Sequence, residues 1–404
     1  MIDPGDTLTR KERMLTALRR QMPDRVPACP DTSAMIPARL TGKPFWDIFY
    51  YERPYIGDAY IDLLNYFGSD GWYIYDQPPF GNAALFPADP HAPMTALAPF
   101  SGHIPAAMVQ KKIVGRYDEM LIVESHIETP LGPLSRCDVY PRADVPWPQE
   151  KWIKDIERDW PRMRWLMGEE WRFRPEFRNR DKLGDLGVYS LMLFLPIDWW
   201  FHNRQGSGTE LIYDFADHAD AIDEIFAYYT TFALAQLEAF IDSGAADELH
   251  IQGSASSLSL ISPAMYRRYN LNFMKAVTAR CKQAGLISHA HICGRSKAVV
   301  QINYAETDLD AMEPLESPPG GDVDLAEAKR AWGDKLALKG NLNTFDLMYR
   351  GTVEQVTAAA KAAIDAAGAG GGFILSTGDQ CGRDTPDANL RALVEVSKTY
   401  GRYR

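Results

Sequence analysis

The amino-acid sequence predicts a (β/α)8 barrel, and three observations support this fold class. Short apolar runs alternate with amphipathic helical stretches through the second half of the chain, as in parallel strands joined by crossover helices. Eight such runs can be found, which is the number that closes a barrel. The length of 404 residues suits one barrel with an insertion. A doubly wound open sheet is the alternative, because it can also contain eight strands.

The predicted elements follow one another along the chain in barrel order. The expected strands are residues 26–29, 70–75, 187–195, 247–252, 286–292, 308–313, 336–340 and 372–376. The expected helices lie near 262–284, 295–304, 324–332, 353–367 and 386–400. Ser262-Pro263 and Thr385-Pro386 each place a capping hydroxyl and a first-turn proline before a helix.

The alternation breaks between residues 76 and 186. The sequence ESHIETPLGPLSRCDVY predicts a β-hairpin that turns around Gly132, and a tryptophan-rich helical stretch is expected at 149–172. We interpret 76–186 as an insertion between the second and third strands that lies over the barrel mouth. Residues 1–404 would then form a single domain.

Composition narrows the classes of function. Hydrophobic residues make up 46% and charged residues 24%, which is ordinary for a soluble globular protein. The net charge of −11 argues against nucleic acid and anionic membrane surfaces as partners. No apolar run approaches the roughly 18 residues of a membrane span, and the first residues lack a signal-peptide pattern. A cytoplasmic location is expected, and five scattered cysteines argue against a disulfide scaffold.

The sharpest local feature is His291-Ile292-Cys293-Gly294, at the carboxyl end of a predicted strand. Residues two apart in an extended segment point to the same side, so His291 and Cys293 can face one metal ion. Cys381 follows the last predicted strand and falls on the same face of a barrel. One imidazole and two thiolates suit zinc, and three protein ligands leave the open position of a catalytic site. Spacing alone leaves buried structural side chains as the alternative.

Several segments resemble the uroporphyrinogen decarboxylase superfamily. They are KERMLTALRRQMPDRVP, ETPLGPL, MEPLESPPGGDVDLAEAKRAWGDKLALKGNLN and GGFILSTGDQCGRDTPDANL, and the resemblance is weakest between 76 and 115. One branch of the superfamily decarboxylates porphyrinogens without a metal or cofactor. A second branch comprises zinc-dependent methyltransferases that serve corrinoid proteins and carry a His-x-Cys…Cys zinc motif. The resemblance therefore implies zinc at His291, Cys293 and Cys381, and a corrinoid-binding protein as partner.

The decarboxylase branch is disfavoured by the residues after the first strand. That branch carries arginines there to bind carboxylates, whereas VPACPDTSAMIPARL has none between Arg25 and Arg39. Asp31 would repel a polycarboxylate rather than bind it. Porphyrinogen decarboxylation is therefore the second choice.

Other predicted site residues lie at or near predicted strand ends. Asp31, Gln252, Glu313 and Asp379 are expected to surround the methyl donor. Glu313 or Glu316 could also supply a fourth zinc ligand at rest, and the alternative is that both are ordinary loop acids. His289 lies two residues before His291, so it points to the same side of the strand and could hydrogen-bond a metal ligand.

An aromatic cluster is the predicted substrate wall. Trp199, Trp200 and His202 follow the third strand, and Tyr75 is the last residue of the second. Aromatic walls suit a planar methoxylated ring, and core packing is the alternative for each residue.

Together these features favour methyl transfer from a methoxylated small molecule to the cob(I)alamin of a separate corrinoid protein. Zinc would act as a Lewis acid on the leaving heteroatom, or on an acceptor thiol if the enzyme is a methylcobamide:thiol methyltransferase. The sequence ELHIQG around His250 nearly repeats a corrinoid-binding signature but occupies a barrel strand, so no corrinoid module is expected in this chain. A non-catalytic binding protein ranks last, because the ligand set is intact.

Overall fold

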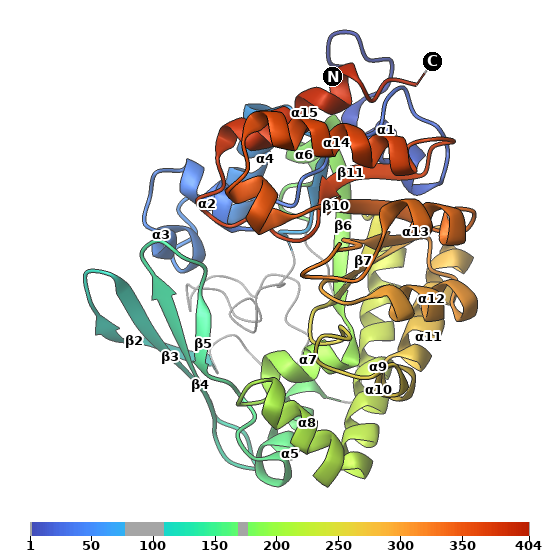
Figure 1. The fold of residues 1–404 in the computed structure, drawn as a ribbon. Helices are drawn as coiled ribbons and strands as arrows, with labels where there is room; N and C mark the ends of the chain where they lie inside the picture. Colours follow the sequence, from blue (N-terminus) through green and yellow to red (C-terminus); the bar gives the residue numbers. More distant parts are fainter. Residues whose placement is uncertain (1, 77–108, 169–176, 404) are drawn as a thin grey trace.

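A computed structural model describes residues 2–76, 109–168 and 177–403. Its main element is a parallel sheet whose strands follow chain order in space (Figure 1). The strands are β1 (Gly71–Tyr73), β6 (Gly187–Phe194), β7 (Glu248–Gly253), β8 (Ile287–Ile292), β9 (Ala311–Glu313), β10 (Ala337–Leu342) and β11 (Phe373–Thr377). Parallel neighbours in chain order require a crossover between every pair, which the intervening helices supply.

The segment 26–29 closes this sheet into a ring. Ala28 bridges Leu375 of β11 in parallel, and the backbone N–H of Cys29 donates to the carbonyl of Leu375 at 2.9 Å. On the other side, the N–H of Asp70, just before β1, donates to the carbonyl of Ala28 at 2.8 Å. Seven of the eight predicted strands are strands of this sheet, and the eighth segment, 26–29, contributes only an isolated bridge to β11. The predicted α/β barrel fold class is confirmed over the open-sheet alternative.

Helices surround the ring and carry the chain from one strand to the next. Those after the strands include α4 (Ile56–Phe67), α9 (Ala219–Ser243), α11 (Leu271–Ala284), α12 (Lys297–Glu306), α13 (Leu325–Trp332), α14 (Val353–Ala367) and α15 (Asp387–Thr399). Shorter helices are α1 (Arg10–Leu18), α2 (Met35–Leu40), α3 (Phe45–Phe49), α6 (Arg180–Leu183), α7 (Pro196–Asn203), α8 (Gly208–Asp217) and α10 (Pro263–Tyr269). Among the helices described here, none combines the length and apolarity needed to cross a membrane.

Two predicted helix starts have different outcomes. The Ser262 side chain accepts from the N–H of Met265, so the predicted cap of α10 is confirmed. The predicted cap at Thr385 is wrong, since α15 begins at Asp387 and its N-cap residue is Pro386, which provides no side-chain hydrogen bond. The predicted helix 262–284 is two helices, which separate at Asn270.

A four-stranded antiparallel sheet is added to the barrel. It consists of β2 (Val109–Arg116), β3 (Met120–Ile127), β4 (Leu134–Pro141) and β5 (Trp147–Glu150). The predicted hairpin is confirmed as β3 and β4. The helical prediction for 149–172 is partly wrong, because residues 149–150 belong to β5 and α5 covers only Ile156–Met167. Residues 169–172 of that prediction, and 77–108 of the predicted insertion, lie outside the described residues.

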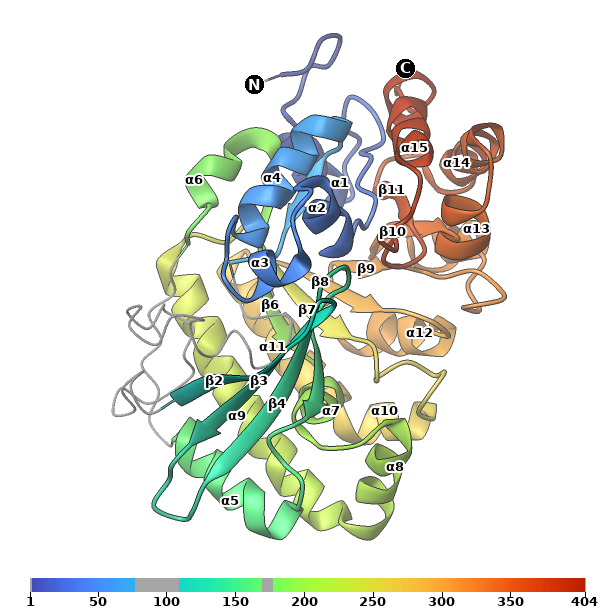
Figure 2. The same ribbon diagram turned by 90° about the vertical axis from the view of Figure 1, so that its left-hand side faces the viewer.

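The antiparallel sheet is attached to loops that follow barrel strands (Figure 2). Arg383, in the loop after β11, donates to the carbonyl of Ala143 between β4 and β5. Ile153, after β5, bridges Arg204 at the end of α7. Since both attachments follow the carboxyl ends of barrel strands, this sheet lies on the mouth side of the barrel, where active sites of this fold form.

Candidate metal centre

Three polar side chains stand in one row across adjacent barrel strands. Gln252 of β7 is the register partner of His291 of β8, and His291 is the partner of Glu313 of β9. Register partners in a parallel sheet project to the same face, so the three side chains are neighbours at the strand ends. His291 and Glu313 are both 2% exposed. Burying such groups is costly unless they pair with one another or with an ion.

The segments after β8 and β11 bring two further candidate ligands close to His291. Cys293 follows β8 directly, and Asp379 follows β11, which lies on the far side of the ring. Ligand atoms of His291, Cys293 and Asp379 all lie within 4.8 Å of one another. His291 is buried, whereas Cys293 and Asp379 are half-buried, so the group opens toward the mouth. An imidazole, a thiol and a carboxylate in this arrangement fit the ligand preferences of zinc.

Glu313 fixes the orientation of His291. Nδ1 of His291 lies 3.1 Å from Oε1 of Glu313, and Nε2 lies 3.7 Å from Oδ1 of Asp379. A proton on Nδ1 that is donated to Glu313 leaves the lone pair of Nε2 directed to the metal group. Metal-binding histidines characteristically donate their second N–H to a carboxylate in this way. This orientation is independent evidence that the group is built to bind a cation.

A buried network of charges holds Glu313 ionised. Lys339 of β10 pairs with Glu313, and its ammonium lies 3.6 Å from the centre of the Trp72 ring. Nε2 of His289 is 3.8 Å from Glu313, and its Nδ1 is 3.5 Å from Glu248. Burial alone would raise the pKa of Glu313, but Lys339 and His289 hold it well below its ordinary value. Glu313 is therefore an anion that can accept the proton of His291.

Sequence reasoning did not identify Lys339 or Glu248 as part of this site. A signal was available, since Lys339 interrupts an otherwise apolar strand, LALKG. In a barrel interior, such a lysine must meet an acid. The acid could not be chosen from the sequence, because Glu313 lies 26 positions earlier and reaches Lys339 only through strand pairing.

Cys381, the third predicted zinc ligand, lies in the same loop after β11 as Asp379. It is fully buried, its N–H donates to the carbonyl of Asp31 at 2.8 Å, and burial raises the pKa of its thiol to about 12. Among the described residues, the group of ligand atoms within 4.8 Å contains Asp379 of the same loop rather than Cys381. The role of Cys381 therefore stays a prediction, and Asp379, predicted to contact substrate, is placed as a candidate ligand.

Asp31 and Gln252 lie beside the metal group. Oδ1 of Asp31 accepts from the N–H of Ser33 at 2.8 Å. Burial raises the pKa of Asp31 to about 6, although Lys339 and His291 act to lower it. Oε1 of Gln252 lies 2.8 Å from Nε2 of His250. Gln252 is the register partner of His291, and the catalytic roles of Asp31 and Gln252 stay predictions.

The residues of the predicted aromatic wall lie in different surroundings in the structure. Trp200 is fully buried, and its indole N–H donates to Asp214 at 2.9 Å. Trp199 stacks on Tyr229 with ring centres 4.6 Å apart. Both positions favour the core-packing interpretation. His202 packs on Phe194, and the hydroxyl of Tyr75 donates to the carbonyl of Ser33, next to Asp31.

We expect Trp200→Ala to reduce the free energy of unfolding by about 3–5 kcal/mol, because it leaves a cavity and removes one hydrogen bond to the buried Asp214. Urea denaturation measures this change. Trp199→Ala, at a partly exposed position, is the control and should cost less. A Trp200→Ala variant of wild-type stability with lost turnover would contradict the core assignment.

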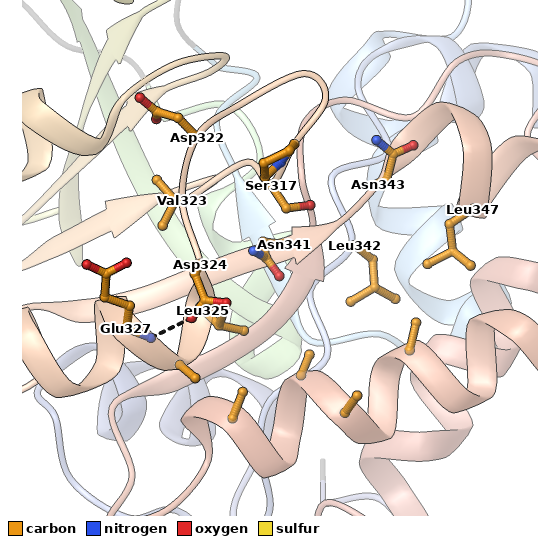
Figure 3. Close-up of a pocket in the computed structure, with 16 residues that line it drawn as sticks. Ser317, Asp322, Val323, Asp324, Leu325, Glu327, Asn341, Leu342, Asn343 and Leu347 are labelled. Atoms are coloured by element: carbon orange, nitrogen blue, oxygen red, sulfur yellow. Dashed lines mark hydrogen bonds between the residues drawn. The ribbon is translucent and has the colours of Figure 1, made fainter.

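A cavity elsewhere in the barrel lacks the imidazole and thiol groups of the candidate metal centre. It measures about 560 Å³ and is bounded by the end of β10, the start of α13 and an alanine-rich face of α14 (Figure 3). Its lining contains neither histidine nor cysteine. Asp322 there accepts from the N–H groups of Ser296 and Lys297, and Asp324 caps α13. These acids are engaged in structure, so the metal group is the better candidate site.

The fold and site describe an α/β barrel with a candidate metal centre, and comparisons show which known proteins this chain resembles. Residues 206–400 match the uroporphyrinogen decarboxylase (URO-D) family. The match covers just under half of the chain and confirms the resemblance noted in the sequence.

Curated relatives include members of both branches. The methylcobamide:CoM methyltransferase MtbA of Methanosarcina mazei is 28% identical over 217 residues, which cover 53% of this chain and 57% of the relative. The methyltransferase MtaA of Methanosarcina barkeri is 26% identical over 45% of this chain and 50% of the relative. A uroporphyrinogen decarboxylase of Dechloromonas aromatica is 29% identical over 45% of this chain and 50% of that protein. The match spans about half the length of these relatives.

A solved structure supports the fold over nearly the whole chain. A methyltransferase from Methanosarcina mazei superposes with a TM-score of 0.62 and covers 97% of this chain and 99% of its own, at 15% sequence identity. At this identity the likeness is one of fold.

Proposed function

We propose that this protein is a zinc-dependent, corrinoid-linked methyltransferase. The observation that carries the proposal is the group of His291, Cys293 and Asp379, with His291 oriented by Glu313. A cofactor-free decarboxylase has no need for a thiol and an imidazole converging at the barrel mouth. The methylcobamide:CoM methyltransferases among the relatives support the same branch.

His291 and Cys293 are the residues that would hold zinc, together with Asp379 or Cys381 from the loop after β11. Zinc, when bound, supplies a Lewis acid next to the methyl-bearing or methyl-accepting heteroatom. The chain itself holds His291 in one tautomer through Glu313 and keeps Glu313 ionised through Lys339. Asp31, whose pKa is raised to about 6 by burial, can hold or release a proton near neutral pH beside that group.

The finer proposal is O-demethylation of a methoxylated small molecule, with the methyl group passing to the cobalt of a separate corrinoid protein. A methyl ether carbon is a weak electrophile, and the thiols proposed at this site are reserved as zinc ligands, so the acceptor must come from outside. Transfer in the other direction, from methylcobamide to a thiol, is the alternative that the names of the relatives favour. The partner in either direction is a corrinoid-binding protein.

The test mixes the zinc-loaded protein and a reduced corrinoid protein with methoxylated donors. We expect a spectral change from cob(I)alamin to methylcobalamin that requires zinc and is lost in His291→Ala. A parallel reaction starts from the methylated corrinoid protein and a thiol, and it measures methyl transfer from the corrinoid to the thiol. Glu327→Gln, in an exposed pair with Lys297, is the matched control and should retain the rate. Release of carbon dioxide from uroporphyrinogen by the metal-free protein would overturn the proposal.

A further inference from the structure

The turn that carries Cys293 lies between the loops that follow β7 and β9. Gly294, the next residue, has a left-handed backbone with a φ of 70°, which glycine adopts without strain. A Cβ at this position would lie 2.9 Å from the hydroxyl oxygen of Ser257 and 2.6 Å from that of Ser259. The turn is therefore closely enclosed, and the neighbouring loops determine the position of the Cys293 thiol.

Glu316, in the loop after β9, holds this turn from one side. Its Oε2 accepts the backbone N–H of Gly294 at 2.7 Å. The carbonyl of Glu316 accepts the N–H of Val323 at 3.0 Å, which fixes the loop itself. Hydrogen bonds to carboxylates are stronger than those between neutral groups. Glu316, which the sequence suggests as a fourth zinc ligand, thus engages the backbone next to Cys293.

The loop after β7 holds the turn from the other side. Arg295, which follows Gly294, donates its N–H to Oγ of Ser259 at 3.1 Å. Its carbonyl accepts the N–H of Leu258 at 2.8 Å. Both backbone groups of Arg295 are therefore bound by residues of one loop. A displacement of that loop would move the turn, and Cys293 with it.

Asp198 anchors the loop after β7 to the barrel. It lies in the first turn of α7 and is 1% exposed. Its Oδ1 accepts the backbone N–H groups of Ser254 and Ala255, and its Oδ2 accepts the hydroxyl of Ser256. Releasing the loop would leave this buried carboxylate without its three donors, which is costly. Asp198 therefore keeps the loop in one position.

We propose that Asp198 and Glu316 are positioning residues for the metal centre, which act through the turn at Gly294 and hold Cys293 toward the metal group before a metal binds. Glu316 acts directly on the backbone of the turn, and Asp198 acts through the loop after β7. A ligand that is already in place loses less conformational entropy on binding, so the affinity is higher. The inference rests on the proposed function, since it takes the candidate metal centre as a zinc site.

Zinc affinity and the visible spectrum of the cobalt-substituted protein test the role of Glu316. Glu316→Ala should weaken zinc binding about 10–100-fold, as is typical when a group that supports a metal ligand is lost. It should also weaken the thiolate-to-cobalt charge-transfer band, which reports thiolate ligands. Glu316→Gln keeps an oxygen that can accept from Gly294, so both readouts should stay close to the wild type. Equal losses in the two variants would identify Glu316 as a metal ligand and overturn the proposal.

Asp198→Ala tests the other side of the turn and should weaken zinc binding at least about 10-fold. Asp159→Ala is the matched control, because Asp159 is a carboxylate of 2% exposure that accepts the backbone N–H groups of Lys154 and Asp155. Asp159 lies in α5, which packs against β4, so its loss should lower the temperature of thermal unfolding and leave zinc affinity unchanged. Zinc affinity that falls equally in Asp198→Ala and Asp159→Ala overturns the role of Asp198.

Glu316 is half-buried in a loop, so its variants decide the proposal even if Asp198→Ala does not fold. Wild-type zinc affinity in Glu316→Ala overturns the proposal, whether or not methyl transfer is observed. A protein whose zinc affinity depends on Glu316 as expected, but which transfers no methyl group, contradicts the proposed function and supports this inference. A wild type that binds no zinc overturns both.

Discussion

Replacing Cys293 with serine should weaken zinc binding by at least about 100-fold, more than the 10–100-fold that is typical for a residue that only supports a ligand. The reason is that a thiolate is removed from a group whose ligand atoms lie within 4.8 Å. Zinc content after dialysis against a chelator, and competition with a chromogenic chelator, measure the loss. The variant should remain folded, because Cys293 is half-buried at the end of a strand that is paired on both sides.

The same measurement identifies the third ligand. Asp379→Asn removes the carboxylate that lies in the group, and Cys381→Ser removes the thiol that the family resemblance favours. We expect Cys381→Ser to cause the larger loss, because zinc prefers a thiolate and can draw the proton from a buried thiol. Cys137→Ser, on the half-exposed part of β4, is the matched control and should bind zinc as the wild type does. A wild-type protein that binds no zinc under reducing conditions would contradict the metal centre.

Replacing Glu313 with glutamine should have two separable effects. It leaves the buried Lys339 ammonium without its counter-charge, so the free energy of unfolding should fall by about 3–5 kcal/mol. It also replaces the carboxylate that accepts the proton of His291, so zinc affinity should fall about 10–100-fold. Urea denaturation and zinc competition report the two effects independently.

A double substitution separates the structural role from the orienting role. Glu313→Gln combined with Lys339→Met removes both buried charges, so stability should recover most of the loss while zinc affinity stays low. Glu327→Gln, at the exposed pair with Lys297, is the control and should change stability by no more than about 1 kcal/mol. Recovery of zinc affinity in the double variant would show that Glu313 acts only through stability.

The barrel could be predicted from the sequence because each strand has a local sequence pattern. LISHAHI and GFILS are short apolar runs between amphipathic helices, and this pattern depends only on neighbours in the chain. The candidate metal ligands His291 and Cys293 could be predicted for the same reason, since two-residue spacing places both on one side of an extended segment. The insertion was harder to predict, since residues 149–150 join β5 through pairing with β4, a contact that no local pattern encodes.

What the sequence alone determined is the order of strands and helices and the position of His291 and Cys293 at a strand end. Tertiary structure decided which distant residues meet them. Glu313 reaches His291 through strand register, and Lys339 reaches Glu313 from the next strand. Asp379 joins the group of candidate ligand atoms from the far side of the ring. Trp200 turns into the core, although its sequence position allowed a substrate wall. The physical reason is that backbone periodicity fixes only the side of the strand or helix on which a residue lies. The partner of a charged or aromatic side chain depends on which element of the closed barrel packs against it.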